Sequence, residues 1–239
     1  MNLVLFEKKD FVDDRHVLLK GRQFLHARDI LHIKTNDVIR VGALGGLLGK
    51  GAVVELGKDS LKLRVSLDEE PPQKLGIILI LSLPRPLVFR RLLSAVAAMG
   101  VRQIVFIQSV RVEKSYWNSP ALNEENVRQA LISGLEQSRD TLLPDVSFEK
   151  RFKPFMDKRL PLLREGKKCF LAHPEKAKPC PSNVKGQMVL AVGPEGGFVP
   201  SEVEAFEKAA FLSVHLGPRI LRVETAVQAL LGRTMSLTR

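Results

Sequence analysis

Cysteine, tyrosine and tryptophan are scarce in this 239-residue sequence, which contains two cysteines, one tyrosine and one tryptophan. Cys169 and Cys180 form neither the paired spacing of a zinc site nor a disulfide framework, so we expect no metal site and a reducing compartment. The longest apolar run, residues 77–83, is far too short to cross a bilayer. Charged residues at 7–10 closely follow a short apolar stretch, and no signal peptide is readable. These absences favour a cytoplasmic protein that does not span a membrane.

Basic residues outnumber acidic ones, with 37 Lys and Arg against 26 Asp and Glu, and the formal net charge is +11. Apolar residues make up 45% and charged residues 26%, which is typical of a globular protein and excludes a disordered or collagen-like chain. A large positive charge attracts polyanions because binding releases their counterions. The charge therefore indicates a nucleic-acid or phosphate partner, and the alternative is a basic surface without a specific role.

The first seventy residues have the pattern of a small β domain. Short β-prone runs are separated by turns that contain Gly and Asp, and they cover residues 2–6, 38–41, 51–56 and 61–67. A polar, proline-marked segment at 69–73 then has the composition of a linker. We predict a barrel-like β domain at 1–70 and a second domain at 74–239.

From residue 76 onward, buried strands alternate with helices. The predicted strands are residues 76–83, 104–108, 146–148, 169–171, 188–192 and 212–216. The predicted helices are residues 88–99 with Gly100 as C-cap, 123–139 with Asn123 as N-cap, 201–209 with a Ser201–Glu204 capping box, and a closing helix that begins near Val223. This alternation predicts a mostly parallel α/β sheet, in which ligands bind beyond the carboxyl ends of strands. Three such places stand out, at residues 172–173, 193–197 and 217–222.

The segment 193–197, Gly-Pro-Glu-Gly-Gly, lies between a strand and a helix. Its three glycines permit positive φ and close approach of a ligand to the backbone, and the alternative is a tight turn without a ligand. The spacing is neither a dinucleotide fingerprint nor a phosphate loop. A second glycine cluster, residues 42–51, has Gly51 where a phosphate loop requires Ser or Thr, so we expect hairpin turns there.

A second motif, residues 216–226, connects the last strand to the last helix. It reads Leu-Gly-Pro-Arg-Ile-Leu-Arg-Val-Glu-Thr-Ala and carries arginines and a glutamate at a strand-to-helix junction. Taken alone, this motif favours a surface turn with solvated charges.

Together the two motifs resemble the SPOUT superfamily, and most closely its RsmE family, which methylates N3 of a uracil in small-subunit (16S) ribosomal RNA. The residues that carry the resemblance are Gly193-Pro194-Glu195-Gly196-Gly197, Leu216-Gly217, Arg219-Ile220-Leu221-Arg222, Glu224-Thr225-Ala226, Glu136-Gln137-Ser138-Arg139 and Pro144. The N-terminal residues Gly21, Arg22, His26 and Leu31 are similar to the family's PUA-like RNA-binding domain. The resemblance is strongest at 188–231 and extends over nearly the whole chain.

The resemblance implies an α/β fold with a SPOUT-type parallel sheet and a C-terminal trefoil knot, preceded by a small PUA-like β-barrel. It implies S-adenosylmethionine as cofactor, small-subunit ribosomal RNA or its assembled particle as partner, and a homodimer in which two protomers complete each site. The implied cofactor-binding residues are Leu171, Ala172, Gly193, Pro194, Glu195, Gly196, Gly197, Leu216, Gly217, Ile220, Leu221 and Arg222.

The proton on uracil N3 must leave before that nitrogen accepts a methyl group, so the reaction needs a base or stabilisation of charge on the neighbouring carbonyl oxygens. We assign the second role to Arg222 and name Glu195 and Glu224 as candidate bases or as residues that orient Arg222. The alternative is that Glu224 only pairs with an arginine near the start of the helix.

Basic and aromatic residues provide candidates for RNA contact. We predict an RNA-binding role for Arg22, His26, Arg28, Arg111, Tyr116, Trp117 and Arg139. The alternatives are that Tyr116 and Trp117 anchor a loop on the core, and that the basic residues of 15–28 form a solvated face. The cations of 150–159 are interpreted as exposed side chains without a specific role. His173 is expected to lie near the ligand without taking part in catalysis.

Three segments depart from the usual family pattern, at 84–86 (Pro-Arg-Pro), 98–101 (Ala-Met-Gly-Val) and 111–117. These departures keep two alternatives open. One is a SPOUT methyltransferase that acts on another RNA, at a base or a ribose 2′-hydroxyl. The other is a non-catalytic RNA-binding assembly factor, against which the glycines at 193, 196 and 197 argue.

Overall fold

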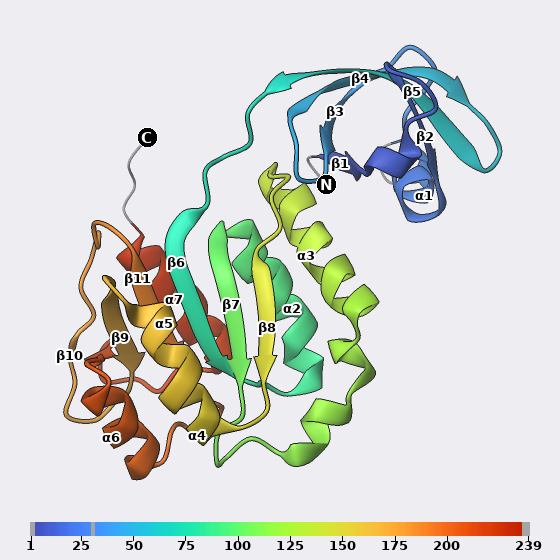
Figure 1. Ribbon diagram of the computed structural model, residues 1–239. Coiled ribbons are helices and arrows are strands. Elements are labelled where there is room, and N and C mark those ends of the chain that lie inside the picture. The colour runs from blue at the N-terminus through green and yellow to red at the C-terminus, as the bar shows by residue number, and fades with distance from the viewer. Residues whose placement is uncertain (1–2, 30–31, 236–239) are drawn as a thin grey trace. The chain divides into compact units, whose positions relative to one another are not determined.

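The computed structural model describes residues 3–29 and 32–235, and the chain divides into two compact units (Figure 1). We call Met1–Gln73 with Leu131–Leu143 the N-terminal unit, and Lys74–Ala130 with Pro144–Arg239 the C-terminal unit. The first boundary lies at the end of the predicted linker. Residues 131–143 lie within the predicted second domain, but they pack with the N-terminal unit.

The N-terminal unit contains a five-stranded, mostly antiparallel sheet. Its strands lie in the spatial order β1 (Val4–Phe6), β3 (Val38–Ala43), β4 (Leu48–Leu56), β5 (Ser60–Glu69) and β2 (His16–Lys20). Along β5, Leu61 and Leu63 are buried and Arg64 is exposed, which is the two-residue period of a sheet with one covered face. The four predicted β runs are therefore confirmed, apart from residue 2, which lies outside the described residues.

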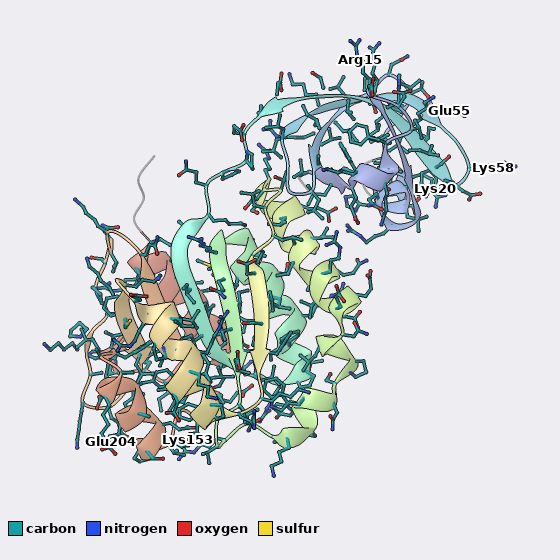
Figure 2. All side chains as sticks on the ribbon, viewed as in Figure 1. Arg15, Lys20, Glu55, Lys58, Lys153 and Glu204 are labelled. Atoms are coloured by element: carbon teal, nitrogen blue, oxygen red, sulfur yellow. The ribbon has the colours of Figure 1, made fainter. Side chains whose placement is uncertain are left out.

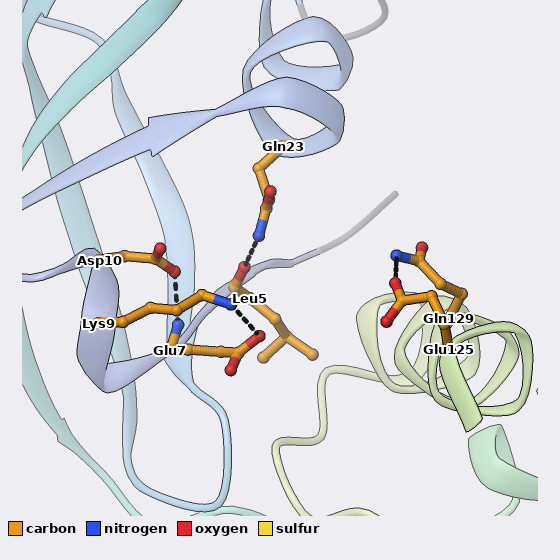
Figure 3. A network of polar contacts seen from close by, with 7 residues as sticks. All are labelled: Leu5, Glu7, Lys9, Asp10, Gln23, Glu125 and Gln129. Carbon is orange, nitrogen blue, oxygen red and sulfur yellow. Dashed lines mark hydrogen bonds and ion pairs between the residues drawn. The ribbon is translucent and has the colours of Figure 1, made fainter.

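A short helix completes this unit and was not predicted. Helix α1 (Gly21–Asp29) buries Phe24 and Ala27 in the same core as Val17 and Leu61, and the one-turn helix η1 (Lys8–Asp10) precedes β2. The side-chain amide of Gln23 donates to the carbonyl of Leu5 over 3.4 Å, which ties α1 to β1 (Figure 3). Arg22, His26 and Arg28 are therefore carried by a helix, whereas Lys20 ends β2.

The glycine cluster at 42–51 is only partly a turn, so the prediction of hairpin turns there was wrong in part. Gly45 lies in the β3–β4 turn with φ +77°, whereas Gly42, Gly49 and Gly51 lie within strands. A Cβ on Gly49 would lie 1.9 Å from the carbonyl oxygen of Ser66 on β5, so close strand packing explains that glycine.

The C-terminal unit contains a seven-stranded sheet in which every pair of neighbours is parallel. Its order is β10 (Lys178–Pro179), β12 (Leu212–His215), β9 (Lys168–Ala172), β11 (Met188–Val192), β6 (Leu75–Ser82), β7 (Val101–Ile107) and β8 (Asp145–Glu149). All five residues of β11 are buried, as expected for a strand covered on both faces. The predicted α/β class and the six predicted strands are confirmed.

Helices cover both faces of this sheet (Figure 1). One face carries α4 (Phe152–Pro154), a π-helical turn η4 (Phe155–Arg159), α5 (Leu160–Arg164) and α6 (Pro200–Lys208). The other carries α2 (Pro86–Ala98) and α7 (Val223–Thr234), which contact each other. After β7 the chain forms the one-turn helices η2 (Lys114–Asn118) and η3 (Pro120–Leu122) and then α3 (Glu124–Ser138), which begins in this unit and ends in the N-terminal unit.

Helix ends agree with the sequence at two places and differ at a third. Asn123 caps α3 by accepting a hydrogen bond from the amide of Asn126 over 2.8 Å, and Gly100 follows α2 with φ +75°. The predicted Ser201–Glu204 capping box is wrong. Helix α6 begins at Pro200, and its first amide partner is the carboxylate of Glu202, which accepts from the amide of Val199 over 3.0 Å.

Candidate functional site

Three turns at the carboxyl edge of the C-terminal sheet line one cavity of about 660 Å³. They follow β9, β11 and β12, which are neighbours in the sheet, so parallel pairing brings their ends to the same edge. The three turns that the sequence singled out are therefore brought together. The lining residues that the sequence predicted as cofactor-binding are Ala172, Gly193, Pro194, Glu195, Gly196, Gly197, Leu216, Gly217, Ile220 and Leu221.

The turn after β11 is held in its shape by its glycines. The amide of Gly197 donates to the carbonyl of Pro194 over 2.8 Å, and Gly197 has φ +73° with open space where a Cβ would lie. A Cβ on Gly193 would lie 3.0 Å from the amide nitrogen of Phe198. Phe198 is buried and packs against Phe206 of α6, with ring centroids 5.1 Å apart. The backbone of this turn is thus exposed to the cavity while its far end is anchored in the core.

The turn after β12 is also organised by a glycine in an unusual conformation. Gly217 has φ +118°, and its amide donates to Nδ1 of His215 over 3.0 Å. Beyond it, Leu221 lines the cavity and Ile220 is 89% exposed. On the neighbouring strand, the amide of His173 donates to the carbonyl of Val214 over 3.0 Å, which fixes the turn after β9 beside the turn after β12.

Not every predicted cofactor residue lies at the cavity surface. Leu171 is fully buried inside β9, paired with strands on both sides, and does not line the cavity. Arg222 is an exposed residue that caps α7, and Glu224 is half-buried in the first turn of that helix. Neither of these two side chains lines the cavity, although Arg222 directly follows Leu221, which does, and Glu224 comes two residues later.

Glu195 lies at the cavity and is connected to the loop after β6. Its carboxylate accepts a hydrogen bond from the amide of Arg85 over 3.3 Å and lies 3.9 Å from Nε of the same residue. Arg111, in the loop after β7, also lines the cavity, and its guanidinium donates to the carbonyl of Gly196. Two of the segments that depart from the family pattern therefore contact the glycine turn directly.

Sequence reasoning gave no role to Glu202, which organises these loops. The side chain is nearly fully buried at 3% exposure, and its carboxylate accepts hydrogen bonds from the amides of Val110 (2.8 Å) and Val199 (3.0 Å). Glu202 thus joins the loop that carries Arg111 to the end of the glycine turn. The signal was available, since Pro200 in the first helical turn with an acidic residue two positions later is typical of a helix start.

Further cavity residues were not among those predicted individually to bind the cofactor, although His173 and Arg219 lie in the predicted ligand-binding turns. They are His173, Pro174, Glu175, Lys176, Val192, Phe198, Pro200, Val203, Glu204, Glu207, Val214, His215, Arg219, Val223, Ala226 and Leu230. They come from the three turns, from the ends of β11 and β12, and from α6 and α7.

The two aromatic residues predicted to bind RNA are both half-buried. The indole N–H of Trp117 donates to Oε1 of Gln108, and its ring lies edge-on to Phe148 with centroids 6.4 Å apart. The hydroxyl of Tyr116 donates to Glu113 over 3.1 Å, and burial together with this carboxylate raises the pKa of Tyr116. The packing of Trp117 supports the alternative that this residue anchors a loop.

The remaining predicted RNA-binding residues lie in the N-terminal unit. Arg22 forms a two-bond ion pair with the buried Glu136 at 2.8 and 2.9 Å, whereas Arg139 is exposed with φ +58°. Arg28 pairs with Asp29 and stacks on Phe24, and burial lowers the pKa of His26. Arg15 and Lys20 are exposed on the same unit (Figure 2).

Within residues 3–29 and 32–235, no group of three or more His, Cys, Asp or Glu side chains is placed to hold a metal ion. Both cysteines are buried free thiols, and burial raises the pKa of each. No helix in the described part of the chain combines the length and the apolar character that a membrane span requires.

Comparison with known proteins agrees with this architecture. The family model described as an RNA methyltransferase domain matches residues 71–235. Ribosomal RNA small subunit methyltransferase E of Treponema pallidum is 28% identical over 96% of this chain and 88% of its own length, and the Borreliella burgdorferi protein named ribosomal RNA small subunit methyltransferase E 1 is 25% identical over 96% and 95%.

Solved structures share the fold. A ribosomal RNA small subunit methyltransferase E from Neisseria gonorrhoeae, bound to S-adenosyl methionine, superposes with a TM-score of 0.75 at 23% identity, over 96% of this chain and 95% of that one. A protein from Legionella pneumophila in complex with the same cofactor gives a TM-score of 0.74 at 20% identity, with the same coverage. Because the matched domain covers well over half of the chain, this protein belongs to the RNA methyltransferase family, as its RsmE-like motifs predict.

Proposed function

We propose that this protein is an S-adenosylmethionine-dependent methyltransferase of small-subunit ribosomal RNA. The observation that carries the proposal is the convergence of three turns, two of them glycine-marked, on one cavity at the carboxyl edge of a parallel sheet. The names of the relatives and the cofactor-bound structural neighbours support the same chemistry.

The residues present fit this cofactor. A cavity of about 660 Å³ lies within the range of about 300–1,000 Å³ that is usual for small-molecule sites. Gly197 leaves open space where any other residue would place a Cβ, and its positive φ exposes backbone groups of the turn to the cavity. The apolar residues Val192, Leu216 and Leu221 suit an adenine ring, while backbone N–H and C=O groups of the turns suit its polar edge.

We propose N3 of a specific 16S uridine as the methylated atom. When bound, S-adenosylmethionine supplies the methyl group that N3 takes in exchange for its proton. Arg222 is assigned to hydrogen-bond a carbonyl oxygen of the base and stabilise its negative charge, and Glu195 or Glu224 to accept the proton or orient Arg222. Because N3 lies on the pairing edge, the base must be unpaired or flipped before it enters the site.

The assembly that we propose is a homodimer in which a second copy completes each site. Arg222 and Glu224 follow the cavity turn without lining the cavity of their own chain, and the adjacent Ile220 is 89% exposed. A second copy that covers Ile220 would bury an apolar side chain at the rim of the site. The expected place of action is the cytoplasm.

We also propose a SPOUT-type trefoil knot in the C-terminal unit and a PUA-like role in RNA binding for the N-terminal sheet, with functional domains at 1–70 and 74–239. The knot is supported by the path of the chain end. Helix α7 contacts α2, which follows β6, and the carbonyls of Arg233 and Thr234 accept hydrogen bonds from Asn183 and Val184, in the segment between β9 and β11.

Mapping of methylated nucleosides tests the proposed reaction. Small-subunit RNA from a deletion strain is incubated with purified protein and S-adenosylmethionine, as naked RNA and as assembled particle, and its nucleosides are identified by mass. We expect 3-methyluridine at one position. A 2′-O-methylated nucleoside would replace the proposed target atom, and no methylation of either substrate would contradict the enzymatic proposal.

The assignment of Arg222 is tested in the same assay. Because Arg222→Ala removes charge stabilisation and leaves the cavity lining intact, we expect methyl transfer to be lost while affinity for S-adenosylmethionine stays within a few-fold. Retained turnover would remove Arg222 from the mechanism.

A further inference from the structure

One segment of nineteen residues, 150–168, carries a net charge equal to more than half of the net charge of the whole protein. That segment holds eight Lys and Arg against two acidic residues, a net charge of +6 in a chain whose total is +11. Its cations are Lys150, Arg151, Lys153, Lys158, Arg159, Arg164, Lys167 and Lys168, and its acids are Asp157 and Glu165.

The fold separates the apolar and the cationic residues of this segment. Through α4, η4 and α5, Phe155, Leu160 and Leu163 are buried against the sheet, in the core that also contains Phe206 of α6. Arg151, Lys158 and Arg159 are exposed. Lys153, labelled at the surface in Figure 2, is the member of the set that pairs with Asp157. The core contacts fix the backbone, so the cations form a surface of defined shape.

This surface begins at the edge of the sheet where the cavity lies. Strand β8 ends at Glu149 on the same sheet edge as the cavity turns, because all strands are parallel. The ammonium of the next residue, Lys150, lies 5.9 Å from the centroid of the Trp117 ring. Trp117 belongs to the loop that begins near Arg111, which lines the cavity and binds the carbonyl of Gly196. The loop after β7 therefore has Arg111 at the cavity and Trp117 beside Lys150, and the other cations follow Lys150 along the chain through α4 and η4.

We infer that Lys150, Arg151, Lys153, Lys158 and Arg159, named here the α4–α5 cationic surface, bind the phosphate backbone of the RNA strand that flanks the target nucleotide. The inference rests on the proposed function, since it assumes that the base enters the cavity beside Arg111. Arg and Lys side chains neutralise phosphates without reading sequence, which positions a strand while the cavity selects the base.

Charge reversal at two exposed members tests this inference in the full chain. The variant is Lys158→Glu/Arg159→Glu, and its matched control is Arg102→Glu/Lys185→Glu, which changes the net charge equally. Arg102 and Lys185 are exposed and lie near the amino ends of β7 and β11, at the opposite edge of the sheet from the cavity. Both proteins are titrated with labelled, deproteinised small-subunit ribosomal RNA over a range of salt concentrations.

We expect the Lys158→Glu/Arg159→Glu variant to bind this RNA at least about tenfold more weakly and to lose about one to two units from its log–log salt slope. The control variant should keep the wild-type slope, and both should keep wild-type affinity for S-adenosylmethionine. Equal losses in the two variants, or no loss in either, would overturn the inference. The inference would also be overturned if the Lys158→Glu/Arg159→Glu variant lost binding to phosphatidylserine vesicles but kept wild-type RNA binding, since that outcome assigns the surface to a membrane.

If the charge-reversed variant has a lower melting temperature than the wild type, the neutral variant Lys158→Gln/Arg159→Gln tests the inference in its place. The neutral pair should retain the wild-type melting temperature and still lose about one unit of slope. A wild-type protein that binds RNA through this surface but fails to bind S-adenosylmethionine would contradict the proposed function and leave the inference standing.

Discussion

The buried carboxylate of Glu202 offers a sharp test of how the cavity is built. One carboxylate oxygen accepts from the amide of Val110 over 2.8 Å and the other from the amide of Val199 over 3.0 Å. Glu202→Ala removes both acceptors and leaves two partly buried N–H groups without them. Each such group costs about 1–3 kcal/mol, so we expect a loss of about 2–6 kcal/mol in the free energy of unfolding.

The loss should also reach the cavity. The loop that Val110 belongs to carries Arg111, whose guanidinium holds the carbonyl of Gly196 at the cavity wall. We expect Glu202→Ala to weaken binding of S-adenosylmethionine as well as stability. Glu202→Gln keeps the volume and one acceptor but turns an NH₂ group toward an N–H donor, so it should lose about half as much stability.

Urea denaturation followed by circular dichroism measures the first effect and calorimetry the second. Ser201→Ala is the matched control because Ser201 is exposed at the neighbouring position of the same helix. If Ser201 were the N-cap, as the sequence suggested, its removal would cost about 1 kcal/mol. We expect no measurable change there. A destabilising Ser201→Ala together with a neutral Glu202→Ala would refute the observed helix start and the role of Glu202.

Two further predictions concern the N-terminal unit. Arg22→Ala leaves the buried carboxylate of Glu136 without its ion-pair partner, and because Arg22 is partly exposed we expect a loss of about 2 kcal/mol, less than for a fully buried pair. The double variant Arg22→Met/Glu136→Gln, which leaves no buried charge unpaired, should lose less stability than Arg22→Ala. An equal or greater loss in urea denaturation would contradict this reasoning. Burial lowers the pKa of His26 below its ordinary value of 6.5, so the unfolded chain takes up a proton first as pH falls. Stability should therefore be retained above pH 6.5 and decrease below it. If the melting temperature of His26→Leu fell between pH 7.5 and 5.5 by as much as that of the wild type, this contribution of His26 would be ruled out.

The sequence predicted the elements whose signal is local and strong. Strands such as β11 are continuous buried aliphatic runs, and the cap of α3 requires only Asn123 and the amide three residues later. The strand-end rule then placed the cavity, because a parallel sheet brings the ends of neighbouring strands together whatever their distance along the chain.

Features that depend on tertiary contact were missed or misread. The π-helical turn at Phe155–Arg159 and the short helix α5, which has Pro161 in its first turn, gain their stability from burying Phe155 and Leu160 in the core of the sheet. Gly49 is required by the directly paired strand β5, where the carbonyl of Ser66 leaves no room for a Cβ, and not by a turn. The sequence allows Trp117 to stack on a base or to anchor a loop, and only the contacts with Gln108 and Phe148 distinguish these roles.

Calorimetric titration of the purified protein with S-adenosylmethionine tests the central claim most directly, when wild type is compared with Gly197→Val. In the variant, a side chain enters the open space beside Gly197 at φ +73°, a backbone conformation that valine strongly disfavours. We predict saturable binding to the wild type and none to a variant that remains folded by circular dichroism. Absence of binding to folded wild-type protein, or equal affinity in the variant, would contradict the assignment of this cavity.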